Sequence, residues 1–100
     1  MEHRALLSVQ IIPKTKDGED VIPYVDRAIS IIRSSGVAYR VGPLETTMEG
    51  PFDQLLAILK QINEAMFEMG CSSVMSQVKL LVGGPHASMD KLLEKYPDGQ

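Results

Sequence analysis

The strongest periodic pattern in the chain is a stripe of apolar residues in its second half. These residues recur three and four positions apart, which predicts one long helix with a single apolar face. Pro51 stands where the pattern begins and Gly70 where it ends, as expected for the two boundaries of a helix. The stripe consists of Leu55, Ile58, Leu59, Ile62, Met66 and Met69.

Two further helical patterns are present. The first has Asp20 as its expected N-cap and Gly36 as its expected C-cap. The second runs from Met89 to Tyr96 and follows Ser88, which is its expected cap. The apolar face of the first is predicted to consist of Ile22, Val25, Ile29 and Ile32.

Four segments between these helices have the patterns of strands. Residues 5–12 alternate between two faces until Pro13 ends the segment. Residues 37–41 and 45–49 flank a Gly-Pro turn and form a predicted hairpin. Residues 72–82 alternate again, which predicts the last strand.

This order of elements predicts an α+β fold, a ferredoxin-like βαββαβ sandwich with a short C-terminal helix. All 100 residues are expected to form one domain. Two right-handed strand–helix–strand units joined by a hairpin give a four-stranded antiparallel sheet with the first and third strands at its centre. Both long helices then cover one face. The uncovered face receives either Thr47 and Glu49 or Thr46 and Met48, depending on a register that the pattern leaves open.

Composition excludes several classes of function. The net charge is −3 and the basic residues are scattered, which argues against a nucleic-acid partner. Cys71 is the single cysteine, and the two histidines lie near opposite ends of the chain, so we expect no metal site. No signal-peptide pattern and no apolar run of about 20 residues is present, so we expect a cytoplasmic protein without a membrane partner.

Catalysis is not indicated by any group of residues. Glu45 and Glu49 share a face of the predicted hairpin, but no Ser-His or Cys-His pair supplies a nucleophile. We therefore expect a protein that is not an enzyme and has no catalytic residues.

Polar side chains collect on the predicted open face of the sheet. Ser8 and Gln10 of the first strand and Gln77 of the last lie there beside the polar hairpin. Hydroxyl, amide and carboxylate groups among apolar ones suit a small flat heteroaromatic ligand, and a carboxylate favours a cation or an amino group. Alternatively, these groups satisfy one another across an interface between subunits, because Leu6 and Met75 also lie on this face.

The hairpin carries a specific motif. Residues 39–50 closely resemble the signature segment of the thiamine-binding protein family of small ferredoxin-like proteins, in the YkoF-like superfamily. The elements of the signature appear in the family's order as Tyr39, Gly42-Pro43, Thr46 and Glu49-Gly50. Residues 8–13 resemble the family's first strand.

The resemblance implies non-enzymatic binding of thiamine or its hydroxymethylpyrimidine moiety by a homodimer or homotetramer, with no cofactor of its own. By position it assigns ligand binding to Thr46, Thr47, Glu49 and Ser8, while Gln10, Tyr39 and Gln77 are added from the expected geometry. Glu45 or Glu49 would suit the cationic thiazolium. Many members have an arginine after the second helix, where this chain has Cys71, so the resemblance implies thiamine rather than its diphosphate. The predicted binding residues are Ser8, Gln10, Tyr39, Glu45, Thr46, Thr47, Glu49 and Gln77.

The alternative function is that of an oligomeric interaction or regulatory module without a small ligand. Substitution of Glu49 by glutamine distinguishes the two, because a binding protein would lose affinity with its assembly intact, whereas an interaction module would change its oligomeric state.

Overall fold

The helices and strands follow one another in the predicted order. The structure, a computed structural model, describes residues 3–85 and 87–94. Within these residues the elements are β1 (Arg4–Pro13), the short 3-10 turn η1 (Lys16–Gly18), α1 (Ile22–Ser34), β2 (Ala38–Val41), β3 (Thr46–Pro51), α2 (Phe52–Glu68), β4 (Val74–Val82) and α3 (Met89–Leu93).

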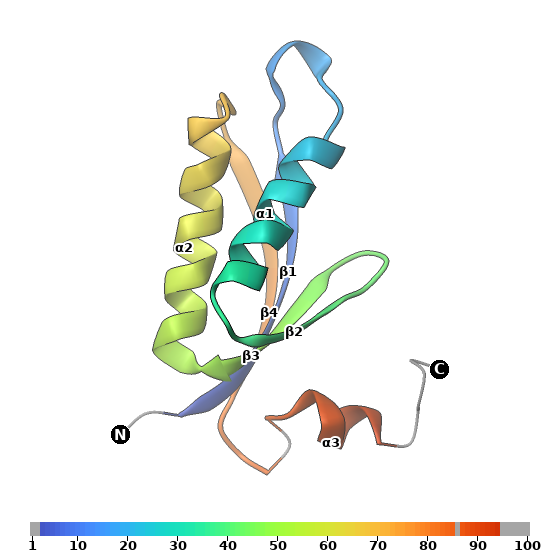
Figure 1. Ribbon diagram of the computed structural model, residues 1–100, viewed down its shortest axis with the longest axis vertical. Coiled ribbons are helices and arrows are strands. Elements are labelled where there is room, and N and C mark those ends of the chain that lie inside the picture. Colours follow the sequence, from blue (N-terminus) through green and yellow to red (C-terminus); the bar gives the residue numbers. More distant parts are fainter. Residues whose placement is uncertain (1–2, 86, 95–100) are drawn as a thin grey trace.

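The strands form one antiparallel sheet in the order β2-β3-β1-β4. Figure 1 shows α1 and α2 side by side over one face of this sheet, with α3 set apart from both, below the β2–β3 hairpin in this view. This is the predicted ferredoxin-like βαββαβ sandwich. None of the described helices is long and apolar enough to cross a membrane.

The register of β3 against β1 decides which hairpin residues face the helices. Leu7 pairs with Met48, and Ser8 pairs with Thr47. Since successive side chains point to opposite faces, Thr47 and Glu49 lie on the open face with Ser8. Thr46 and Met48 lie on the face covered by α1 and α2, which we call the helix face.

The core lies between the helix face and the two long helices. Its fully buried side chains come from β1, β3, α1 and α2. The predicted stripe supplies the buried side of α2, although Met69 lies just beyond the helix and is exposed. The largest fully buried side chains are Leu7, Ile32, Met48, Leu55, Ile62 and Met66.

The predicted apolar face of α1 needs a correction. Ile22 is exposed, while Tyr24 is buried and donates a hydrogen bond from its hydroxyl to Glu19 Oε2 at 2.9 Å. The N-cap of α1 is Val21, without a capping side-chain bond, and not Asp20 as predicted, although Asp20 Oδ1 accepts the Ile22 N–H at 3.1 Å. The buried side of the helix is made of Tyr24, Ala28, Ile31 and Ile32.

The C-terminal helix begins where it was predicted. Ser88 is its N-cap and accepts a hydrogen bond from the backbone N–H of Lys91 at 3.5 Å. The helix ends at Leu93, and Tyr96, the last residue of the predicted pattern, lies outside the described residues.

Candidate functional site

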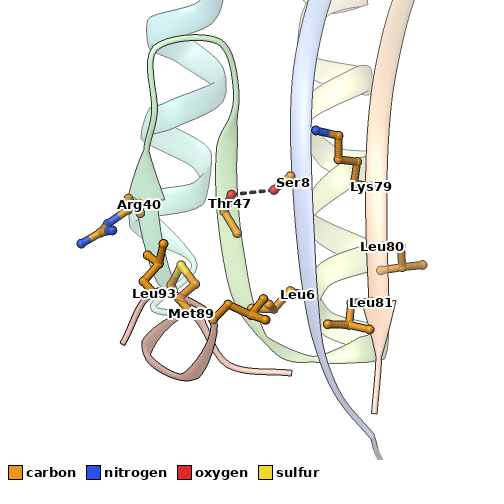
Figure 2. A pocket seen from close by; sticks show the side chains of 10 residues that line it. Leu6, Ser8, Arg40, Thr47, Lys79, Leu80, Leu81, Met89 and Leu93 are labelled. Atoms are coloured by element: carbon orange, nitrogen blue, oxygen red, sulfur yellow. Dashed lines mark hydrogen bonds between the residues drawn. The ribbon is translucent and has the colours of Figure 1, made fainter. Parts of the chain in front are cut away.

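Two hydroxyl groups meet at the centre of the open face. Ser8 lies on the central strand β1, and its Oγ is 2.5 Å from Thr47 Oγ1 on β3. Figure 2 shows this hydrogen bond bridging the two strands. The two residues are direct cross-strand partners, so the register of the sheet holds their hydroxyls together.

An ion pair borders the hydroxyl pair. Lys79 is the partner of Ser8 on β4, and its Nζ donates a hydrogen bond to Glu45 Oε1 at 3.0 Å. The Lys79 ammonium lowers the pKa of the Glu45 carboxyl below its ordinary value, with a smaller contribution from Ser8 in the same direction. Glu45 is therefore a carboxylate at neutral pH.

Glu49 attaches α3 to the sheet. Its Oε1 accepts a hydrogen bond from the backbone N–H of Met89 at 2.7 Å, and its Oε2 lies 3.3 Å from Arg4 Nη2. A carboxylate at this position satisfies an N–H group that the first turn of a helix leaves free. Gly83 and Gly84, both with positive φ, turn the chain from β4 toward α3.

The attached helix roofs a cavity of about 320 Å³, which we call the open-face cavity. Met89 and Leu93 of α3 rise toward the sheet below Arg40, whose guanidinium points away from the cavity (Figure 2). The cavity is apolar under α3 and polar toward the ion pair. The residues that line it are the polar Ser8, Arg40, Thr47 and Lys79 and the apolar Leu6, Leu80, Leu81, Met89, Leu92 and Leu93.

The other predicted residues on this face lie around the cavity or beyond it. Glu45 borders the polar end through Lys79, and Glu49 borders the apolar end through its bond to α3. Gln10 and Gln77 are cross-strand partners farther along the face and do not line the cavity.

Tyr39 and Thr46 lie on the opposite face of the sheet. Tyr39 packs against the core, and its hydroxyl accepts a hydrogen bond from Arg33 Nε at 3.3 Å. Thr46 pairs with Val9 of β1 and is only 8% exposed. The structure therefore separates these two residues from Ser8 and Thr47.

A second cavity, of about 250 Å³, lies on the helix face. It is bounded by α1, by β1 and by the turn between β2 and β3, and we call it the hairpin cavity. Three of the predicted binding residues, Gln10, Glu45 and Thr46, line it together with residues of the core and the turn. Its apolar lining includes Val21, Val25 and Ile29 at and near the start of α1, and Val41, Pro43 and Leu44 of the hairpin.

Sequence reasoning did not include Lys79 or α3 among the binding residues, although both lie at the open-face cavity. The position of Lys79 in β4 could have revealed it, because Lys79 becomes the cross-strand partner of Ser8 once the strand order and register are known. The helix α3 could have been found from the spacing of Met89, Leu92 and Leu93, which predicts that one side of this helix is apolar. Among the described residues, no three His, Cys, Asp or Glu side chains come together as metal ligands.

Comparison with known families and structures gives consistent matches. Residues 7–95 match a family described as thiamine-binding protein. A UPF0045 protein of Clostridium perfringens (strain 13 / Type A) is 41% identical over 90 residues, covering 90% of this chain and 94% of that relative.

Solved structures show the same fold. A domain of unknown function, DUF77, from Bacillus cereus superposes with a TM-score of 0.86 at 32% identity, covering 97% of this chain and 93% of that one. A Thermotoga maritima protein, described as a candidate thiamine biosynthesis/salvage protein, superposes with a TM-score of 0.81 at 26% identity. That match covers 93% of this chain and 98% of the other.

Proposed function

The chain belongs to the thiamine-binding protein family, and on this premise we propose that it binds thiamine or its hydroxymethylpyrimidine moiety in the open-face cavity, without catalysing a reaction. The volume of about 320 Å³ supports this, since pockets for small molecules begin at roughly 300 Å³. The mixture of an apolar roof and a few polar groups is also typical of such pockets.

The observation that carries the proposal is the hydroxyl pair of Ser8 and Thr47. Each hydroxyl has one hydrogen to donate and two lone pairs to accept. Their mutual bond uses one hydrogen and one lone pair, so one hydrogen and three lone pairs stay available. An aminopyrimidine offers ring nitrogens that accept and an amino group that donates, and it would match both.

The cationic thiazolium would lie toward Glu45. This carboxylate is ionised at neutral pH and lies next to the hydroxyl pair, and a carboxylate can accept more than one hydrogen bond. The side chain of its partner Lys79 is 82% exposed, so its ammonium can turn to solvent at small cost when a ligand cation approaches. The apolar roof of Met89 and Leu93 would cover the rings.

The uncovered part of the open face supports assembly as a homodimer or homotetramer. Met75 is 62% exposed there, and Ile12, its cross-strand partner, is also exposed. Neither lines the open-face cavity, and a second subunit would remove both from water. The second candidate function, an interaction module with no small ligand, rests on this apolar end alone.

Isothermal titration with thiamine and, separately, with hydroxymethylpyrimidine tests the proposal on protein of known oligomeric mass. We expect micromolar binding of both, and a loss of roughly three- to tenfold for Ser8→Ala or Thr47→Val, as for one lost hydrogen bond. Ser72→Ala removes an exposed hydroxyl outside the cavity and serves as the matched control. Dissociation constants of a millimolar or weaker for both ligands would refute the proposal and favour the interaction module.

A further inference from the structure

The strand β4 forms an outer edge of the sheet, and half of its backbone groups point away from β1. At one end of the β1–β4 ladder the N–H of Gly83 donates to Arg4 O at 2.8 Å, and at the other the N–H of Lys14 donates to Ser73 O at 3.0 Å. In an antiparallel ladder, hydrogen-bonded pairs alternate with non-bonded pairs. The odd-numbered residues of β4 therefore bond β1, and the even-numbered ones direct their N–H and C=O groups outward. These are Val74, Ser76, Val78, Leu80 and Val82.

The side chains of the outward-directed residues lie on the helix face. Val78 and Leu80 pair with Val9 and Leu7, which belong to the core, and side chains of paired residues share a face. Nevertheless Val78, Leu80 and Val82 are 40% to 43% exposed. The helices thus leave an apolar strip uncovered along this edge.

The side of α2 next to β4 extends this strip. Asn63 of α2 accepts a hydrogen bond from the Ser76 hydroxyl at 3.0 Å, so this side of the helix faces β4. Leu56 lies two turns before Asn63 on the same side and is 40% exposed. A long edge with outward backbone groups and exposed apolar side chains beside it is a template for a further strand.

We propose that β4 is an interaction surface for β4 of a second copy of this chain, paired antiparallel about a two-fold axis at Val78. The two strands then overlap over all 9 residues of β4, and each outward-directed residue lies opposite one of the partner. Such a pair exchanges two hydrogen bonds, so about ten bonds would join the two sheets into one. The exposed apolar strips of both copies then meet along the new junction.

Charge favours this alignment over its neighbours. With the axis at Val78, Lys79 lies opposite the partner's Gln77. An axis at Lys79 would shorten the overlap and place two ammonium groups opposite each other, which is destabilising. The surface is distinct from the apolar end of the open face at Ile12 and Met75, and the proposal does not depend on thiamine binding.

Single cysteines test the axis on the full chain, in a Cys71→Ala background because Cys71 is the single natural cysteine. Val78→Cys should form a disulfide-linked dimer on mild oxidation, since hydrogen-bonded partners lie about 5.5 Å apart at Cα, within the range of a disulfide. Leu80→Cys is the matched control. It would face the partner's Ser76, so the two introduced cysteines would lie about 13 Å apart along the strands and should not link.

Association of the reduced proteins gives a second measurement, by analytical ultracentrifugation. Val78→Pro removes an outward N–H without affecting the ladder to β1, and should weaken dimerisation by roughly tenfold or more. Val78→Thr keeps the N–H and the branched side chain and should dimerise like the wild type.

Three outcomes would overturn the proposal. One is a wild-type chain that stays monomeric at millimolar concentration, and another is equal linking, or none, at the two cysteine positions. The third is loss of the Val78→Cys link when Met75→Glu places a charge on the open face, because association would then run through that face.

Discussion

The adjacent threonines of β3 lie in opposite surroundings. Thr47 faces a cavity with charged groups and a helical roof, and its hydroxyl is bonded to Ser8. Thr46 faces a cavity lined mostly by apolar residues, and its hydroxyl has no bond to a described residue. The face of the sheet, and not the type of residue, therefore decides what a side chain in this motif can do.

The largest expected effect is a difference in stability loss between truncated side chains on the two faces of the sheet. Leu7→Ala removes a fully buried side chain from the helix face and should lower the free energy of unfolding by about 2–5 kcal/mol. Leu81→Ala makes the same change on the open face at a partly exposed position and should cost less than about 1.5 kcal/mol. Denaturant titration measures both, and equal costs would contradict the assignment of the core to the helix face alone.

The next effect concerns the roof of the open-face cavity. Glu49→Ala removes the acceptor for Met89 N–H and the partner of Arg4, and should cost about 1.5–3 kcal/mol at α3. Amide hydrogen exchange should become faster in residues 89–94 and stay unchanged in β1. Thiamine affinity should fall because the roof is lost.

Glu49→Gln is the matched control for this change. Its amide oxygen can still accept from Met89, whereas the charge that pairs with Arg4 is gone. Exchange in α3 should therefore lie between that of the wild type and that of the alanine variant. If exchange in α3 is the same in all three proteins, Glu49 does not hold the helix.

A smaller effect tests the two threonines directly. Thr47→Val breaks the bond to Ser8 and should lower the free energy of unfolding by about 0.5–1.5 kcal/mol. Thr46→Val removes a hydroxyl that bonds to none of the described residues and should be neutral or stabilising. A double-mutant cycle of Ser8→Ala with each threonine variant should show coupling for Thr47 only, and coupling with Thr46 would contradict the register.

The smallest expected effect is a dependence of the folding stability on pH. The pKa of Glu45 is lowered in the folded protein, so the folded state binds this proton less readily than the unfolded chain. Its contribution is present above the ordinary value of 4.5 and is lost as the pH falls through the folded pKa. Because the pair is exposed to solvent, the contribution should be less than about 1 kcal/mol, and Lys79→Gln should remove it from stability curves measured between pH 3 and 7.

The sequence was sufficient to predict the fold because its periodic patterns are long and agree with one another. The stripe from Leu55 to Met66 and the alternation in residues 5–12 leave few ways to arrange the layers. Ile22 was placed in the core wrongly, because Tyr24 takes the buried side of the first turn of α1 and periodicity does not reveal which of the two residues does so.

The site could be predicted only in part. Ser8 and Thr47 could be placed on candidate faces, but their contact depends on a register that one residue of slip reverses. The bond from Glu49 to Met89 joins residues 40 positions apart in the sequence. It depends on the turn at Gly83 and Gly84, whose direction no local pattern specifies.

The pairing of β1 with β3 also protects the two cavities against misassembly. A slip of one residue would exchange Thr46 and Thr47, and with them the chemistry of both cavities. The same slip would expose Met48 to water and move the carboxylate of Glu49 into the core, where an unpaired charge is very costly. The neighbours of the threonines thus make the incorrect alignment unfavourable, and a refolding chain has a strong thermodynamic reason to return each hydroxyl to its own side.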